Sequence, residues 1–540
     1  MQAQDLTNLQ REGNERFRHK NYIGAIESYT AVLEKKPDDA VVLSNRAQAY
    51  LNLSQFREAL SDAEAAVGFD DGQKKAKFRM FKALYGLKKY EEATATLEAL
   101  NRDEVFEGND EIRGLLRKAN ERVAEQRFGR YNIVNIVHEA RSTSPPILDH
   151  AEYIGPVRVA QIPGRGRGVI VTRDVEEGTL LMCCKAFSVA FKNEMKDNRL
   201  NLPANYKNDP EPHLVAKIFL KLRKEPWAAS ELANLPQPVS AMALDPSIPP
   251  QVANVINIVN ANFIVPDEDT AMMRPRTVQA INTLPDIRVG RQPPDGAGLW
   301  TFPSFINHSC LDNAVHVTFG DMMFVRAARP IARGEEVLLA HVAPFVPYDL
   351  RVEYLRRRGI ECRCSLCTFE NSLPPLVRNR RHGLQSELNA LGSRINVGDP
   401  EALARLGEII CETRETYGGH VEDRSSKGNA GFPPRQLQFG LILPFSMLVF
   451  SLNMRGRYAQ AVQVLQELFE IQPHCGCLAR QRVKTAMALV RGCNLLGKLD
   501  ERNRWIEVAK KGFGSVYGDA EDGSAKIWEE IYKMDLFWNM

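Results

Sequence analysis

Residues 299–310 read LWTFPSFINHSC, and Cys362 to Cys367, 52 residues after Cys310, read CRCSLC. Together Cys310, Cys362, Cys364 and Cys367 supply four thiols, three closely spaced and one remote, as in the closed tetrahedral sites of structural zinc. Such a metal would hold the segment after residue 350 beside the loop that ends at Cys310, and would act as a folding element. The spacing therefore predicts one structural Zn²⁺.

Short β-branched runs begin near Pro156. VRVAQI (157–162) and GVIVTR (168–173) flank the sequence Gly-Arg-Gly-Arg-Gly at 164–168. Alternating glycines allow a ligand to approach the backbone closely, and arginines bind carboxylates. A tight turn between two strands also favours glycine, so the loop is a weak signal by itself. These runs predict a β-rich central domain.

Taken in chain order, the glycine loop, NHSC, RGEEV (333–337) and the cysteine cluster resemble the SET-domain protein-lysine methyltransferases over about Pro156 to Cys367. The resemblance extends to fungal proteins that combine tetratricopeptide repeats with a SET domain. It implies that S-adenosylmethionine is bound by Arg165, Gly166, Arg167, Asn307 and His308. It also implies the post-SET zinc site of the SET-and-MYND subclass. The chain departs from that subclass because no CxxC pairs lie between Cys184 and Cys310, so the MYND finger is absent.

A helical insert is expected at 192–287, where Val255, Ile256 and Val259 follow a helical spacing. It resembles the insert that splits SET domains. Asn262, in the sequence VNANF, matches an asparagine-containing motif near the cofactor in the subclass, which makes it a further cofactor-binding candidate. An asparagine at a helix end also commonly acts as a cap.

The residue expected beside the substrate amine departs from the family. Seven residues after Gly334, where the family has a tyrosine, this chain has His341, and Ile360 replaces an aromatic wall of the lysine channel. Imidazole can accept an N–H hydrogen bond or a proton near neutral pH. Tyr348 is a candidate to supply the missing hydroxyl. The resemblance leaves two hypotheses: an active methyltransferase of protein lysines, which we favour, or a catalytically impaired SET pseudoenzyme that serves as an interaction scaffold.

The N-terminal region repeats with a period of 34 residues, in which Ala25, Ala59 and Ala93 each follow an aromatic residue by three positions. A small residue at a helix–helix contact and an aromatic at the turn are typical of stacked helix pairs. The pattern resembles three tetratricopeptide repeats, which with a capping helix predict an α-solenoid over 6–142.

The inner face of this solenoid is predicted to carry Asn14, Asn45, Lys75 and Arg79. Such a set can hold a carboxylate. It resembles the carboxylate clamp of co-chaperone repeats, which bind the acidic C-terminal tail of heat-shock chaperones, although Gln10 stands where that pattern has a lysine. These residue types are also common surface choices in such repeats, and we weigh the two interpretations evenly.

Helical periodicity returns at 375–540, where GRYAQAVQVLQEL (456–468) resembles the repeats and predicts an all-α repeat-like domain. His474, Cys475 and Cys477 could form a second metal site, but three candidates without a fourth ligand favour loop and core residues. The longest apolar run, 439–452, contains Pro444; we expect a helix pair broken there, and the run is too short to span a bilayer.

The charge balance, 70 basic against 67 acidic residues with a net charge of +3, indicates neither a nucleic-acid nor a membrane surface. The polar first ten residues lack the apolar core of a signal peptide, so an intracellular location is expected, with nucleus and cytoplasm both open. The expected class is α+β multidomain: solenoid 6–142, linker 143–155, SET domain 156–350, post-SET zinc segment 351–370 and the helical domain. The expected partner is a protein lysine substrate.

Overall fold

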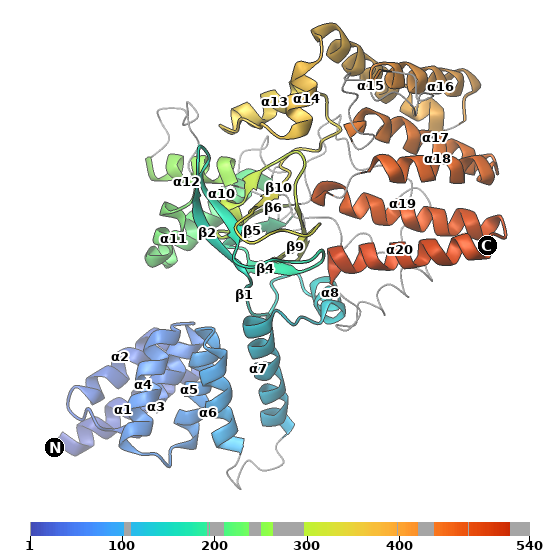
Figure 1. Cartoon of the computed structure of the whole chain (residues 1–540). Coiled ribbons are helices and arrows are strands. Elements are labelled where there is room, and N and C mark those ends of the chain that lie inside the picture. The colour runs from blue at the N-terminus through green and yellow to red at the C-terminus, as the bar shows by residue number, and fades with distance from the viewer. Residues whose placement is uncertain are drawn as a thin grey trace. The chain divides into compact units, whose positions relative to one another are not determined.

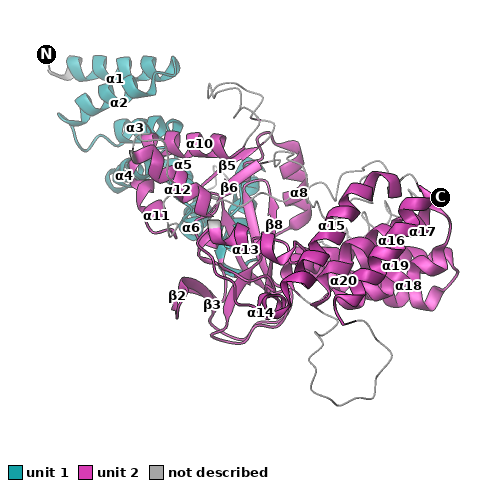
Figure 2. Ribbon diagram, turned by 90° about the horizontal axis from the view of Figure 1, so that it is seen from above, with its two compact units in different colours: residues 1–130, 149–153 teal, residues 131–148, 154–540 magenta. Residues whose placement is uncertain are grey.

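The computed structural model describes residues 2–101, 110–191, 194, 210–236, 250–262, 296–396, 398–418, 437–472 and 475–518. The chain divides into two compact units, 1–130 with 149–153 and 131–148 with 154–540 (Figure 2). Helical repeats, a β-rich centre and C-terminal helices follow one another along the chain (Figure 1), so the expected α+β multidomain class is confirmed.

The first unit consists of antiparallel helices in which each helix packs on the next. They are α1 (Gln2–Arg18), α2 (Tyr22–Leu33), α3 (Ala40–Asn52), α4 (Phe56–Phe69), α5 (Lys74–Gly86), α6 (Tyr90–Asn101) and α7 (Asp110–Phe128). The repeated alanines at 25, 59 and 93 are all fully buried.

The turns within the three helix pairs share one backbone conformation. Lys20, Ser54 and Lys88, again 34 residues apart, have φ values of 60°, 58° and 61°. This left-handed region is unfavourable for residues other than glycine, so its recurrence shows that each repeat turns in the same way. The sequence carries no glycine at these positions to signal it.

Part of the segment 143–155 is anchored to α7 within the first unit. The buried carboxylate of Glu125 lies 2.7 Å from Nδ1 of His150 and accepts the backbone N–H of Ala151 at 2.8 Å. Arg122, also buried, pairs with the same carboxylate at 2.9 Å. Residues 149–153 are therefore packed on the helices that precede them.

The centre of the second unit is a set of small sheets. One has the order β1-β4-β9-β8, a second β2-β3-β10-β7 and a third β5-β6. The strands are β1 (Tyr153–Ile154), β2 (Val157–Ile162), β3 (Gly166–Val171), β4 (Leu180–Lys185), β5 (Ser188–Phe191), β6 (Gly296–Leu299), β7 (Asn307–His308), β8 (Ala314–Phe319), β9 (Met322–Ala327) and β10 (Glu336–Leu339). The β-branched runs at 157–162 and 168–173 form the β2–β3 hairpin, and their buried side chains pack with Trp300 and β9 into one core.

The pairing of β10 positions the site. It runs antiparallel to β3 but parallel to β7, with Leu338 opposite Asn307 and Leu339 opposite His308. The β8–β9 hairpin lies between β7 and β10 in the sequence. The Asn-His segment and the residues after β10 are therefore brought side by side by a long-range contact.

The described part of the expected insert is helical. It comprises α10 (Pro210–Lys224), the 3₁₀ turn η3 (Pro226–Ala228), α11 (Ala229–Ala233) and α12 (Pro250–Asn262). Leu214, Ile218, Val255 and Val259 pack with β5 and β6 in a separate core. Within 192–287 the structure describes residues 194, 210–236 and 250–262.

Helix α8 (Ile133–Ser142) precedes the sheets, and the 3₁₀ turn η5 (Pro303–Phe305) lies between β6 and β7. The helices that follow the sheets are α13 (Tyr348–Arg357), α14 (Ser365–Ser372), α15 (Pro375–Asn396), α16 (Pro400–Glu415), the 3₁₀ turn η7 (Phe439–Leu441), α17 (Ile442–Met454), α18 (Tyr458–Ile471), α19 (Gly476–Leu495) and α20 (Leu499–Tyr517).

The expected break of the helix at Pro444 is wrong. Pro444 lies in the first turn of α17, where the backbone N–H of a residue has no partner within the helix, so a proline there removes no hydrogen bond. None of the described helices is long and apolar enough to cross a membrane.

Candidate active site and zinc centre

The four predicted cysteines are brought together. Cys310 follows β7, Cys362 and Cys364 lie between α13 and α14, and Cys367 is in the first turn of α14. Their sulfur atoms all lie within 4.8 Å of one another, and Sγ of Cys310 is 3.9 Å from that of Cys362 and 3.5 Å from that of Cys367. Zn–S bonds of about 2.3 Å place tetrahedral sulfurs about 3.8 Å apart. The donor set and spacing therefore fit Zn²⁺.

A buried arginine supports this centre. Arg351, which is fully buried, donates to the carbonyl oxygens of Pro344 and Val346 at 2.9 and 2.7 Å, and its Nη2 lies 3.7 Å from Sγ of Cys367. Its charge is compensated by an ion pair with Glu370. Arg351 thus ties the turn after β10 to the cysteine-bearing helix α14.

The glycine loop and the Asn-His segment meet at one carboxylate, that of Glu336. Nη1 of Arg165 donates to Oε2 of Glu336 at 2.9 Å, and Nδ2 of Asn307 donates to Oε1 at 2.7 Å. Arg165 also donates to the backbone carbonyl of His308. A Cβ on Gly168 would lie 2.6 Å from Oε1 of Glu336, so only glycine permits this approach. Sequence reasoning did not identify Glu336 in this role.

Open space borders the same loop. Gly164 and Gly166 have φ values of +70° and +72°, and a Cβ at either would meet nothing within 4 Å. Arg167 lies beside it with its guanidinium 4.9 Å from the ring centre of Phe305. Gly164, Arg165, Gly166 and Arg167 are all exposed, so this loop is accessible to a ligand.

The buried His308 side chain has a partner at each ring nitrogen. Nδ1 accepts the backbone N–H of His341 at 3.0 Å, and Nε2 lies 3.3 Å from Sγ of Cys310. Since Nδ1 is an acceptor, a neutral His308 carries its proton on Nε2 and donates it toward the sulfur. The side chain therefore links the loop of Cys310 to the segment after β10, whereas the contact of His308 with Arg165 is made by its backbone carbonyl.

His341 lies against His308, with ring centres 5.3 Å apart. Burial, with the nearby His308 and Arg358, lowers the pKa of His341 from 6.5 to about 3, so the ring is neutral at physiological pH. Its Nδ1 is buried and finds no hydrogen-bond partner among the described residues. The ring is thus neutral, and one of its nitrogens is enclosed by the protein.

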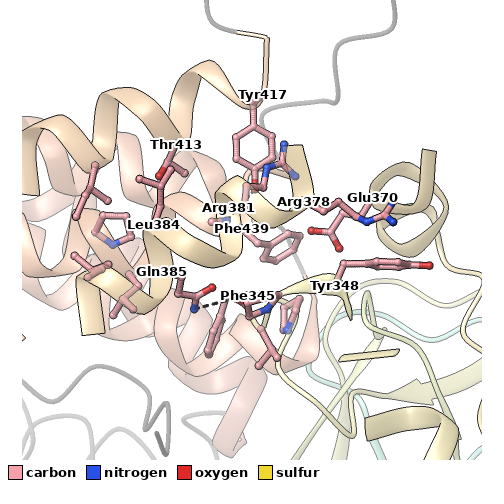
Figure 3. Close-up of a pocket in the computed structure, with 18 residues that line it drawn as sticks. Phe345, Tyr348, Glu370, Arg378, Arg381, Leu384, Gln385, Thr413, Tyr417 and Phe439 are labelled. Carbon is pink, nitrogen blue, oxygen red and sulfur yellow. Dashed lines mark hydrogen bonds between the residues drawn. The ribbon is translucent and has the colours of Figure 1, made fainter. Parts of the chain in front are cut away.

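Tyr348 is not brought to His341 by any described contact. It begins α13 and lines a cavity of about 40 Å³ between the turn at 344–348 and helices α15 and α16 (Figure 3). The guanidinium groups of Arg351 and Arg378 lie 5.9 and 5.5 Å from its ring centre. On the opposite side of this cavity, Arg381 stacks at 3.7 Å on the ring of Tyr417.

Asn262 lies at the end of α12 and has its described contacts within the insert. Its Nδ2 donates to the carbonyl oxygens of Pro236 and Ile258 at 2.9 and 2.8 Å. These bonds hold two segments of the insert together. No described contact joins Asn262 to Asn307 or to the glycine loop.

In the first unit, three of the four predicted groove residues form one hydrogen-bonded chain. Asn14 Oδ1 accepts from Tyr29 at 2.8 Å and from Asn45 at 3.4 Å, and Asn45 Oδ1 accepts from Arg79 at 3.5 Å. Burial lowers the pKa of Arg79, and no acidic partner for it is found among the described residues. Lys75 is exposed on the same helix, α5.

Comparison with known proteins adds independent information. Residues 166–341 match the family model of the SET domain. A methyltransferase of Gibberella zeae is 26% identical over 428 residues, which cover 76% of this chain and 58% of that protein. This chain therefore spans little more than half the length of that relative.

The N-terminal repeats match other proteins. Human tetratricopeptide repeat protein 12 is 45% identical over 82 residues, 15% of this chain and 12% of that protein. The Hsp70-Hsp90 organizing protein of Triticum aestivum is 34% identical over 121 residues, 21% of each chain. A solved structure of the first TPR of Spaghetti (RPAP3) bound to HSP90 peptide SRMEEVD is 34% identical over 22% of this chain and 94% of that chain, with a TM-score of 0.22.

Proposed function

We propose that this chain, whose residues 166–341 match the SET domain and whose N-terminal repeats match tetratricopeptide repeat proteins, is an intracellular, S-adenosylmethionine-dependent protein-lysine methyltransferase. The observation that carries the proposal is the parallel pairing of β7 with β10, because it sets His341 beside the Asn307–His308 segment. The cofactor supplies the methyl group. Arg165, Gly166, Arg167 and Asn307 would hold it, and the zinc-bound cysteines would hold the loop that bears Asn307.

His341 has a restricted role in this proposal. With a pKa of about 3 it does not store a proton at neutral pH, so the proton of the methylated amine leaves to solvent. As a neutral imidazole, it can accept one N–H of a neutral lysine amine and orient the nitrogen lone pair. A tyrosine hydroxyl would have done the same with an oxygen acceptor. Tyr348, which lines a different cavity, is the weaker candidate for this role.

The presence of His341 where the family has a tyrosine favours the second candidate function, a SET pseudoenzyme that acts as a scaffold. Calorimetry with S-adenosylmethionine and methyl incorporation into cell extract separate the two. We expect the wild-type protein to bind S-adenosylmethionine and to incorporate methyl groups into the extract. Asn307→Ala should abolish both activities, and the control Asn52→Ala should retain them. Binding without incorporation under any condition would establish the scaffold, and His341→Tyr would then show whether the site is a damaged catalyst.

For the repeats, we propose that the groove binds the acidic C-terminal tail of a heat-shock chaperone. Arg79 is a partly buried cation without an acidic partner among the described residues, and a peptide carboxylate would compensate its charge. The wheat relative bears the name of a chaperone-organizing protein.

Titration of the full chain with a peptide ending in MEEVD tests the clamp. We expect binding that falls at least tenfold in Arg79→Ala and Lys75→Ala, and that is retained in Lys89→Ala. An amidated peptide, which lacks the terminal carboxylate, should not bind. Equal binding of the free and amidated peptides would contradict the clamp.

A further inference from the structure

A second group of metal-binding side chains lies in the second unit, beside the four-cysteine centre. Asp312 follows the NHSC loop by two residues, and Cys475 and Cys477 lie at the start of α19, more than 160 residues later. Their ligand atoms lie within 4.8 Å of one another, and the two sulfurs are 3.5 Å apart. That separation equals the 3.5 Å between Cys310 and Cys367 in the predicted zinc centre.

The group is held rigidly by backbone contacts. Oδ1 of Asp312 accepts the backbone N–H of Cys477 at 3.0 Å, and Oδ2 accepts that of Ala340 at 3.1 Å. Between the two cysteines, a Cβ on Gly476 would lie 1.6 Å from the carbonyl oxygen of Ala314. The Cys-Gly-Cys sequence can therefore approach this strand only with glycine at its centre.

The charge of the group is not compensated by protein side chains. Asp312 is 3% exposed, and no ion pair to it is found among the described residues. As two thiolates and a carboxylate these three groups would repel one another, whereas a divalent cation would stabilise all three.

We propose that Asp312, Cys475 and Cys477 bind a second Zn²⁺, distinct from the ion of the four-cysteine centre. Two thiolates and one carboxylate are ligands that zinc takes, and the sulfur separation is close to the roughly 3.8 Å of a tetrahedral zinc site. Three protein ligands leave a fourth position for water. His474, which the sequence also offered, lies outside the described residues and is not needed for the proposal.

The metal would join the SET domain to the C-terminal helices. Asp312 belongs to the loop between β7 and β8, and the cysteines begin a helix that packs on β8, where Arg480 donates to the carbonyl oxygen of His316 at 2.6 Å. Sγ of Cys477 also lies 3.9 Å from the carbonyl oxygen of Cys310. The two ions would thus lie on adjacent sides of one loop.

Zinc counting on the full chain tests the proposal. The protein is purified with zinc supplied, dialysed against a weak chelator and assayed by elemental mass spectrometry. We expect two zinc ions per chain, falling to one in Cys477→Ser and in Asp312→Asn, and remaining two in the control Cys493→Ser. One ion per chain in the wild type and in Cys477→Ser alike would overturn the proposal.

Native alkylation provides a readout that does not depend on a folded variant. In the wild-type protein, iodoacetamide should label the exposed Cys411 and spare the six cysteines of both centres, together with the buried Cys183, Cys184 and Cys493. A strong chelator should expose Cys475 and Cys477 together. If the chelator exposes only the four-cysteine set, the second site does not exist. A mass 2 Da below the reduced chain, with 475 and 477 joined, would show a disulfide there and would equally refute the proposal. Neither readout depends on methyl transfer.

Discussion

The backbone N–H of His341 donates a hydrogen bond to Nδ1 of His308 across a distance of 3.0 Å, while Nε2 of His308 lies 3.3 Å from the sulfur of Cys310. One imidazole thereby connects the zinc loop, the Asn-His strand and the segment expected to face the substrate. Loss of metal at the cysteine centre should for this reason change the position of His341.

Replacement of His308 tests this connection. His308→Ala leaves the N–H of His341 without an acceptor in a buried place, which should lower the free energy of unfolding by about 1–3 kcal/mol. We expect binding of S-adenosylmethionine to weaken in parallel, because Asn307 is the adjacent residue. Urea unfolding and calorimetry measure the two effects. His138→Ala, an exposed histidine of α8, is the control, and an unchanged unfolding midpoint in His308→Ala would disprove the connection.

The low pKa of His341 predicts an acid-dependent loss of stability. Between pH 6.5 and about 3 the unfolded chain binds a proton at this residue that the folded chain excludes. The free energy of unfolding therefore falls as the pH decreases through that window, and is unaffected by this group above it. In His341→Phe the decrease should be shallower. Urea titrations of both proteins at pH 7, 6 and 5 compare the slopes, and parallel slopes would show that His341 titrates normally.

Removal of the structural metal should unfold the post-SET segment. Cys364→Ser removes one of four ligands, so we expect zinc at that centre to be lost and the melting temperature to fall by several degrees. Cys411→Ser, an exposed cysteine of α16, should change neither quantity. Elemental analysis and differential scanning calorimetry provide the measurements. Full zinc content in Cys364→Ser would mean that the four thiols do not form one site.

The close approach of the glycine loop to Glu336 predicts that substitutions at Gly168 and at Gly164 differ strongly in their effect on cofactor affinity. In Gly168→Ala the new methyl would lie 2.6 Å from Oε1 of Glu336 and 2.8 Å from Nδ2 of Asn307, so the hairpin must move and cofactor affinity should drop at least tenfold. Gly164→Asn is the matched change, since its Cβ meets open space and asparagine tolerates positive φ. Calorimetry with S-adenosylmethionine compares them. Equal affinities would place the cofactor away from this loop.

The repeat period, the strand runs of the β2–β3 hairpin and the cysteine cluster could be predicted because each is a local pattern. The helix-pair turns at Lys20, Ser54 and Lys88 could not, since no glycine marks their positive φ. The predicted helix break at Pro444 was wrong because a proline in the first turn of a helix does not interrupt it, and the sequence does not show where that turn begins. Glu336 and Arg351 were missed because a buried charge acquires its role only from partners far along the chain.

The sequence by itself determined the order of the helical and β-rich regions, the repeat and the four cysteines of the predicted metal centre, because residue type and spacing are sufficient for these. Only the tertiary structure decided that His308 turns its ring toward Cys310 and His341, that Tyr348 lies in a different cavity, and that Asp312 meets Cys475 and Cys477. The first depends on the parallel pairing of β7 with β10, the second on the packing of the turn at 344–348 against α15 and α16, and the third on the packing of α19 against β8. Such long-range contacts leave no periodic trace in the residues that make them.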